Sequence, residues 1–135
     1  MKIYYLLIIA LGCFSVNSAL ADSPAVTKLL KEYTAQGANK PDLQAGQRLW
    51  STTFKGDKRF AQRSCASCHT TNLKQKGKHL KTKKVIDPMA PSVNAERLTS
   101  TREIKKWLKR NCKWTLGREC TAAEKTNLLT YIKQQ

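Results

Sequence analysis

One short stretch, Cys65-Ala66-Ser67-Cys68-His69, brings two thiols and an imidazole together. Two cysteines separated by two residues can each form a thioether with one vinyl group of the same haem. The histidine that follows them then reaches the iron through a ring nitrogen. We therefore expect one covalently attached haem c, held by Cys65 and Cys68, with His69 as the proximal ligand.

Two other chemistries use closely spaced cysteines, and the sequence supports neither. A zinc site needs a second pair of cysteine or histidine ligands at similar spacing, which the sequence lacks. A thioredoxin-like redox site needs a βαβ pattern around the cysteines, and this is also missing. Haem attachment is therefore the interpretation that the motif favours.

The N-terminus has the pattern of an export signal. Lys2 precedes a nearly continuous apolar run, and Ala19-Leu20-Ala21 forms a cleavage site before Asp22. This pattern predicts a secretory signal peptide over residues 1–21 and a single mature domain over residues 22–135, located in the periplasm. The alternative is lipoprotein processing at Cys13, whose surrounding residues match that pattern poorly.

The chain is strongly basic, with 25 lysines and arginines against 9 acidic residues and a net charge of +16. Nucleic acid is the usual partner for such a charge. Export argues against it, and no nucleic-acid-binding motif is present. An acidic protein or an anionic membrane surface fits better. No stretch of the expected mature chain is long and apolar enough to span a membrane.

The five cysteines divide by role. Cys13 leaves with the signal peptide, and Cys65 and Cys68 take the haem. Cys112 and Cys120 remain, and in an oxidising compartment they are expected to form a disulfide. Closing so short a loop contributes about 2.5 kcal/mol in the chain-entropy model. The alternative is two free, buried thiols.

Apolar residues at helical spacing and capping residues predict an all-α domain. We expect the helices to begin at about Ser23, Asp42, Ser100 and Thr121, the last two with capping boxes completed by Glu103 and Glu124. Residues 70–85 are expected to form a loop, and no strand is predicted. In the second helix, Gly46 and Trp50 share one face, where the glycine allows another helix to approach closely and the tryptophan covers the contact.

That loop contains Lys74, Lys76, Lys78, Lys81, Lys83 and Lys84. Such a run is most often a solvated surface. The alternative is a docking surface beside the haem for an acidic redox partner. His79 lies within the run and is interpreted as a surface residue rather than an iron ligand.

Two residues compete for the second axial position of the iron. Met89 lies in a proline-flanked segment, and methionine with histidine makes an electron-carrying cytochrome c. It is equally a packing residue for an apolar pocket. Asn111 continues the stripe of Ile104, Trp107 and Leu108, where an amide must be satisfied. It either caps the end of its helix or faces the iron.

Three segments together resemble the SHP ("sphaeroides haem protein") cytochromes c. They are Ser64-Cys65-Ala66-Ser67-Cys68-His69, Ile86-Asp87-Pro88-Met89-Ala90-Pro91-Ser92, and residues 103–120, which contain Lys106-Trp107-Leu108-Lys109-Arg110-Asn111-Cys112 and Gly117-Arg118-Glu119-Cys120. The C-x-x-C-H pattern in the first segment is generic to c-type cytochromes, whereas the W-L-x-R-N-C…G-R-x-C pattern in the last is specific. The likeness covers nearly the whole mature chain.

The resemblance implies a class I cytochrome c fold, a single domain around one covalent haem, and a Cys112–Cys120 disulfide. It implies that His69 and, in the oxidised protein, the side-chain oxygen of Asn111 ligate the iron. In that family the asparagine leaves on reduction, and the ferrous haem binds oxygen, nitric oxide or carbon monoxide.

The family's redox partners are a dihaem cytochrome c and a membrane cytochrome b. Reduction of oxygen and conversion of nitric oxide are the candidate activities. The alternative function is a simple electron carrier with His69 and Met89 as permanent ligands.

These expectations fix the mass of the exported protein. It should equal that of residues 22–135 plus one haem, less two hydrogens for the disulfide, because the A-x-A site precedes Asp22. Intact mass spectrometry of protein from the periplasmic fraction checks this. A mass that includes Cys13 and a lipid would show that the chain is processed as a lipoprotein instead.

Overall fold

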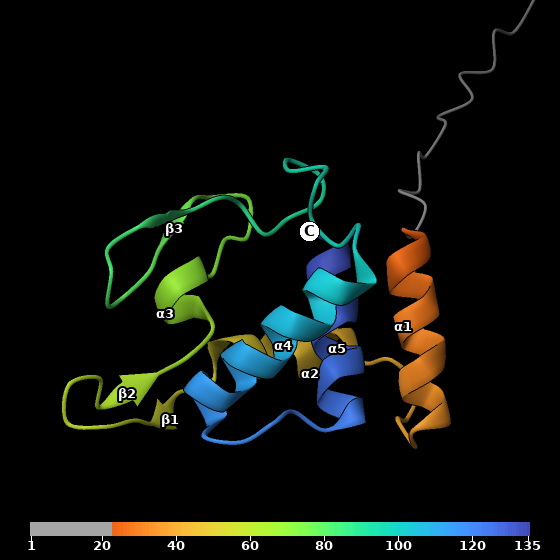
Figure 1. Cartoon of the computed structure of the whole chain (residues 1–135), viewed down its shortest axis with the longest axis horizontal. Helices are drawn as coiled ribbons and strands as arrows, with labels where there is room; N and C mark the ends of the chain where they lie inside the picture. The colour runs from red at the N-terminus through yellow and green to blue at the C-terminus, as the bar shows by residue number, and fades with distance from the viewer. Residues whose placement is uncertain (1–22) are drawn as a thin grey trace, which may run out of the picture.

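The computed structural model describes residues 23–135. The predicted signal peptide and Cys13 lie outside the described residues. Four long helices and one short helix dominate the described chain, with two small hairpins between them (Figure 1). In chain order the elements are α1 (Pro24–Ala35), α2 (Leu43–Ser51), β1 (Phe54–Lys55), β2 (Gln62–Arg63), α3 (Ala66–His69), β3 (Gly77–Lys78), β4 (Val85–Ile86), α4 (Thr101–Leu116) and α5 (Ala122–Lys133).

The long helices begin where the sequence predicts. The residue before each one accepts a hydrogen bond through its side chain from a backbone N–H of the first turn; these residues are Ser23, Asp42, Ser100 and Thr121. The capping box at Thr121 is complete, with Glu124 bonding back to the cap. The box at Ser100 is only half formed, because the Glu103 carboxylate instead accepts bonds from Lys106 and Trp107.

The prediction of no strands was wrong at two places. β1 pairs with β2, and β3 pairs with β4, each as an antiparallel ladder of two residue pairs. Strands this short cannot show the alternation of apolar and polar residues by which a strand is recognised. The two hairpins lie on either side of α3 (Figure 1).

α2 and α5 cross closely at Gly46, as predicted. A Cβ atom at this position would lie 2.1 Å from the backbone oxygen of Asn127 and 2.8 Å from the Cβ of Tyr131. Trp50, one turn further along α2, is 3% exposed and packs against Tyr131 with ring centroids 5.9 Å apart. The glycine therefore brings the two helices together, and the tryptophan seals the contact.

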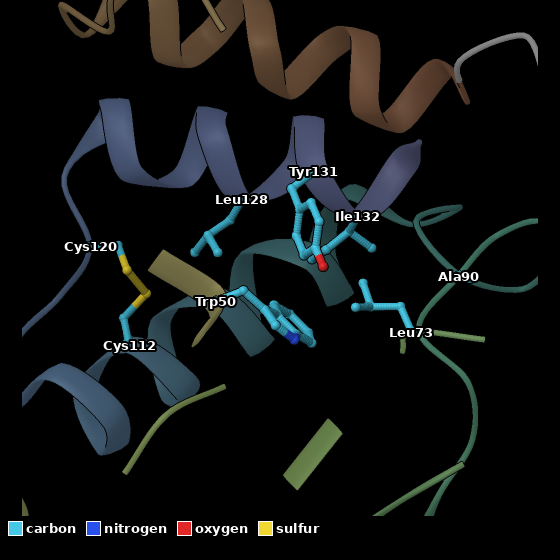
Figure 2. Close-up of a cluster of buried hydrophobic side chains, with 8 residues drawn as sticks. All are labelled: Trp50, Leu73, Ala90, Cys112, Cys120, Leu128, Tyr131 and Ile132. Carbon is cyan, nitrogen blue, oxygen red and sulfur yellow. A yellow bond between two sulfur atoms is a disulfide. The ribbon is translucent and has the colours of Figure 1, made fainter. Parts of the chain in front are cut away.

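Two groups of buried side chains form the core. One lies between α1, α4 and α5 and includes Val26, Leu29 and Ile104. The other joins α2, α4 and α5 to the segments after the haem motif (Figure 2). We call it the site-side core; its buried members are Trp50, Leu73, Ala90, Cys112, Cys120, Leu128, Tyr131 and Ile132.

α4 differs from the prediction in two respects. It runs on to Leu116 and ends at Gly117, which adopts a left-handed conformation with φ 77°. Asn111 therefore lies within the helix, and the interpretation of this residue as a cap was wrong. Trp107 is 47% exposed, although it was expected on the apolar face with Ile104 and Leu108.

The helix crossing provides a test of the fold. Replacing Gly46 with Ala should lower the free energy of unfolding by about 1–3 kcal/mol, because the new methyl group meets the rigid backbone of α5. Denaturant unfolding of the haem-containing protein measures this. The exposed neighbour Gln47 serves as the control, since Gln47→Ala should change stability by less than about 0.5 kcal/mol. Equal effects of the two changes would contradict close packing at Gly46.

Candidate functional site

The haem motif forms a single helical turn, α3, stabilised by the residues around it. Ser64 and Ser67 exchange hydrogen bonds through their side chains and backbone N–H groups. The carbonyl of Cys65 accepts a bond from the N–H of His69 at 3.1 Å. These contacts place both free thiols and the imidazole on one rigid turn, as thioether attachment requires.

Cys65 faces the protein interior. Its side chain packs against the site-side core, and its sulfur is hydrogen-bonded to the hydroxyl of Thr115 on α4. Burial raises the pKa of this thiol to about 11. The first cysteine of the motif is therefore held directly against α4.

His69 packs in a largely apolar surrounding. Its ring lies 5.5 Å from the ring of Trp50 between centroids. Burial, with a smaller contribution from the charge of Arg97, lowers the imidazole pKa to about 4. The ring is therefore neutral at physiological pH, the form that ligates metals. Its Nδ1 atom is buried and has no hydrogen-bond partner among residues 23–135.

The segment after the motif is fixed by Trp50 and Gly77. The Trp50 indole N–H donates to the carbonyl of Thr70 at 2.9 Å. Thr70 has a positive φ of 65°, which turns the chain sharply after His69. At Gly77, a Cβ atom would lie 2.0 Å from the carbonyl oxygen of Cys68, so only glycine lets β3 pack on α3.

Met89 lies on a segment that is hydrogen-bonded to the chain just after His69. Its backbone N–H donates to the carbonyl of Leu73 at 2.9 Å. Leu73 comes shortly after His69 in the chain. The carbonyl of the preceding residue, Pro88, accepts a bond from Arg97 at 2.8 Å. The partly buried Met89 side chain packs against the site-side core.

Asn111 lies on the inner face of α4. Residues in an ideal helix are 100° apart, so Asn111 and Thr115 project within about 20° of the direction of Ile104. Ile104 is 7% exposed and Thr115 is 3% exposed. Asn111 itself is only half-buried, and its amide makes no hydrogen bond to any of residues 23–135. An unpaired amide thus projects from the interior face of α4.

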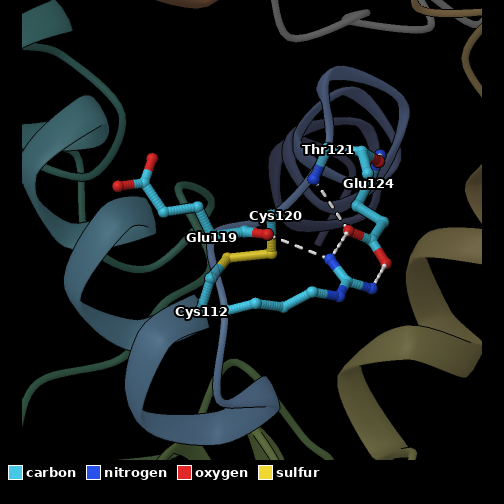
Figure 3. A network of polar contacts seen from close by, with 6 residues as sticks. Cys112, Glu119, Cys120, Thr121 and Glu124 are labelled. Atoms are coloured by element: carbon cyan, nitrogen blue, oxygen red, sulfur yellow. Dashed lines mark hydrogen bonds and ion pairs between the residues drawn. A yellow bond between two sulfur atoms is a disulfide. The ribbon is translucent and has the colours of Figure 1, made fainter.

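The Cys112–Cys120 disulfide is present, as predicted, and ties the end of α4 to the start of α5 (Figure 3). Both cysteines are buried in the site-side core. Beside the bridge, Arg118 makes two 2.7 Å bonds to the carboxylate of Glu124. Because Cys112 directly follows Asn111, the disulfide restrains the helix backbone next to Asn111.

The lysine run lies over the Cys68 end of the motif. Its six lysines are exposed, and in the described part of the chain none of them forms an ion pair. A pocket of about 440 Å³ opens between this run and Cys68, lined among others by Lys76, Lys78 and Lys83. His79 accepts a bond at Nδ1 from the N–H of Thr82, so this ring nitrogen is occupied within the loop.

The residues present fit a covalent haem. Two free thiols lie on one turn, and the neutral imidazole beside them has a buried ring nitrogen without a partner. Apolar side chains from the site-side core surround them. Sequence reasoning missed two residues of this site, Arg97 and Thr115. Thr115 had a usable signal, since it lies one turn beyond Asn111 on the same face, whereas nothing in the sequence distinguished Arg97 from other arginines.

Comparisons with known proteins give the family of this chain. A family described as "Domain of unknown function (DUF1924)" matches residues 36–132. The cytochrome c-type protein SHP of Cereibacter sphaeroides is 34% identical over 93% of this chain and 95% of its own length. The chain belongs to the SHP-type cytochromes c. Cytochrome c'' of Methylophilus methylotrophus is also 34% identical, over 98% of this chain and 94% of its own.

Solved structures confirm the class I cytochrome c fold of this SHP-type protein. Oxidised SHP, described as an oxygen-binding cytochrome c, matches with a TM-score of 0.74 and 33% identity, covering 85% of this chain and all of the SHP chain. Oxidised cytochrome c'' matches with a TM-score of 0.70 and 31% identity, covering 82% and 94%. The protein is therefore a monohaem cytochrome with covalently attached haem c. None of the helices in residues 23–135 has the length and apolar character of a membrane span.

Proposed function

We propose that this SHP-type cytochrome accepts electrons in the periplasm and, once reduced, binds small diatomic gases at an iron position that Asn111 vacates. The haem supplies an iron that changes oxidation state and can take a gas molecule as a ligand. His69 holds one side of the iron in both states. The side-chain oxygen of Asn111 holds the other side in the oxidised protein.

The observation that carries this proposal is the unpaired amide of Asn111. It projects from the inner face of α4, and the next turn of that face, at Thr115, touches the sulfur of Cys65. The amide therefore belongs to the face that meets the haem. An unpaired amide on the inner face of a helix lacks a protein partner, and ligation of the iron would supply one.

Ligand chemistry favours release of the amide on reduction. An amide oxygen is a hard ligand, which prefers the more highly charged ferric iron, whereas a methionine thioether prefers the softer ferrous iron. The relatives support both parts of the proposal. One is described as an oxygen-binding cytochrome c, and the solution structure of cytochrome c'' is described in terms of haem-ligand detachment.

The alternative is an electron carrier with His69 and Met89 as ligands. The backbone of Met89 is bonded to Leu73, and that of Pro88 to Arg97, whose charge acts on His69. Both contacts hold the backbone of this segment through residues near His69. This arrangement favours a packing role for Met89 and leaves Asn111 as the candidate for the second ligand.

The lysine run is the surface at which we expect an electron donor to dock. Its exposed, unpaired charges surround the pocket beside Cys68, where one thioether attaches. A dihaem cytochrome c with an acidic surface, itself reduced by a membrane cytochrome b, fits this position. Reduction of oxygen or conversion of nitric oxide would be the catalytic outcome if the protein turns over.

The ligand assignment is tested by two single substitutions. Asn111→Ala should leave haem attachment intact and should raise the rate at which cyanide binds the oxidised protein by roughly tenfold or more, because the iron is no longer protected by its own ligand. Met89→Leu conserves volume and should leave the rate within about twofold. Stopped-flow spectroscopy measures both rates. The reverse pattern would indicate methionine ligation. A reduced wild-type protein that fails to bind carbon monoxide would contradict the release of Asn111.

The docking surface is tested by charge reversal. Replacing Lys76, Lys78 and Lys81 with Glu should slow electron transfer from an acidic donor cytochrome by about tenfold at low salt, because electrostatic steering is lost. Rising ionic strength should slow the wild-type reaction as well. The same change at Lys28, Lys31 and Lys40, on and after α1, is the matched control. If both triple variants react at the wild-type rate, the lysine run is only a solvated loop.

A further inference from the structure

We infer that the Thr115 hydroxyl orients the amide of Asn111 so that its oxygen, and not its nitrogen, faces the iron. This inference rests on the proposed ligation by Asn111 and names the residue that positions it. Thr115 is a positioning residue, since it acts through Asn111.

The two side chains are neighbours on α4. Residues four apart on a helix lie one above the other, with Cβ atoms about 5–6 Å apart. Helical side chains lean toward the N-terminus, so Thr115 leans over the turn that carries Asn111. With 3% exposure, Thr115 is sealed from solvent and must find its hydrogen-bond partners within the protein.

Haem attachment changes the partners of this hydroxyl. Before attachment it is hydrogen-bonded to the sulfur of Cys65. The Cys65 S–H then adds across a vinyl group: sulfur bonds to one vinyl carbon, the hydrogen goes to the other, and no oxidant is needed. The hydroxyl donates in this contact, so the lone pairs of its oxygen are free to accept a hydrogen bond. The thioether sulfur that replaces the thiol has no proton and cannot donate to them.

Asn111 offers the complementary group. Its amide has one oxygen and two N–H donors, and within residues 23–135 neither end is bonded. When the oxygen faces the iron, the N–H groups need an acceptor, and the Thr115 oxygen is the buried acceptor one turn away. Donation from the N–H also draws electron density onto the amide oxygen, which makes it a better ligand. The bond from the amide N–H to the Thr115 oxygen thus turns the amide oxygen toward the iron and increases the strength with which that oxygen binds it.

The Thr115 hydroxyl could instead serve only to bond the helix backbone. A threonine within a helix often donates its hydroxyl to the carbonyl four residues earlier, here the backbone of Asn111. That bond alone would satisfy the donor without affecting the amide. The two roles differ in their effect on the iron, so ligand kinetics separate them.

The experiment replaces Thr115 with Val, which removes the hydroxyl and keeps the shape. Cyanide binding to the oxidised, haem-containing protein should accelerate roughly tenfold, the effect of losing one hydrogen bond to the ligand. The high-spin fraction in the ferric optical spectrum should rise in parallel. Thr115→Ser should restore wild-type behaviour. Thr126→Val is the matched control, because it removes another buried hydroxyl: Thr126 on α5 is 0% exposed, and its hydroxyl has no partner within the described chain.

A double variant shows whether Thr115 acts through Asn111. In an Asn111→Ala background, Thr115→Val should add nothing to the cyanide rate. A further acceleration there, or a wild-type rate for Thr115→Val alone, would overturn the inference. If Asn111→Ala itself binds cyanide at the wild-type rate, the proposed ligation fails, and this outcome is distinct. Should Thr115→Val fail to mature with haem, Thr115→Ala removes the same hydroxyl and provides the same comparison.

Discussion

The close crossing of α2 and α5 is the contact on which the haem site depends. Gly46 lets the backbones meet, and this fixes Trp50 against Tyr131. The Trp50 side chain then makes two further contacts. Its ring packs on the ring of His69, and its indole N–H donates to the carbonyl of Thr70. The motif turn places His69 beside the two thiols, and helix packing then fixes the position of its ring. The thiols therefore depend on local sequence, whereas the imidazole ring also depends on long-range packing.

Much of the fold could be predicted because its signals are local. The N-caps at Ser23 and Thr121 and the glycine at position 46 are each recognised within a few residues. The hairpins could not be predicted, because ladders of two residue pairs have no periodicity of their own. The β3–β4 ladder forms because Gly77 packs on the Cys68 carbonyl, a contact made by the fold and not visible in the segment itself.

The site shows the same division. Haem attachment at Cys65 and Cys68 could be predicted from their spacing alone. The Cys112–Cys120 bridge could be predicted from the oxidising compartment that the export signal implies. The helical stripe predicted the inward direction of Asn111, but it did not give the end of α4, so capping remained a rival interpretation until Gly117 was seen to end the helix. Arg97 could not be identified, because its relation to His69 depends on a loop whose path is set by backbone bonds to Leu73 and Pro88.

The anchoring of α4 has a consequence for the energetics of electron transfer. The N-terminal end of α4 packs through Ile104 into the core formed with α1 and α5, and its C-terminal end is held by the disulfide and by ion pairs from Lys109 and Lys113 to Glu119. A helix held at both ends cannot shift as a body when a ligand on it is exchanged. Departure of Asn111 would then require rotation of one side chain, with the backbone left in place. The protein's own contribution to the reorganisation energy of such a step would be that of a single rotamer change, so no movement of α4 would have to accompany the electron.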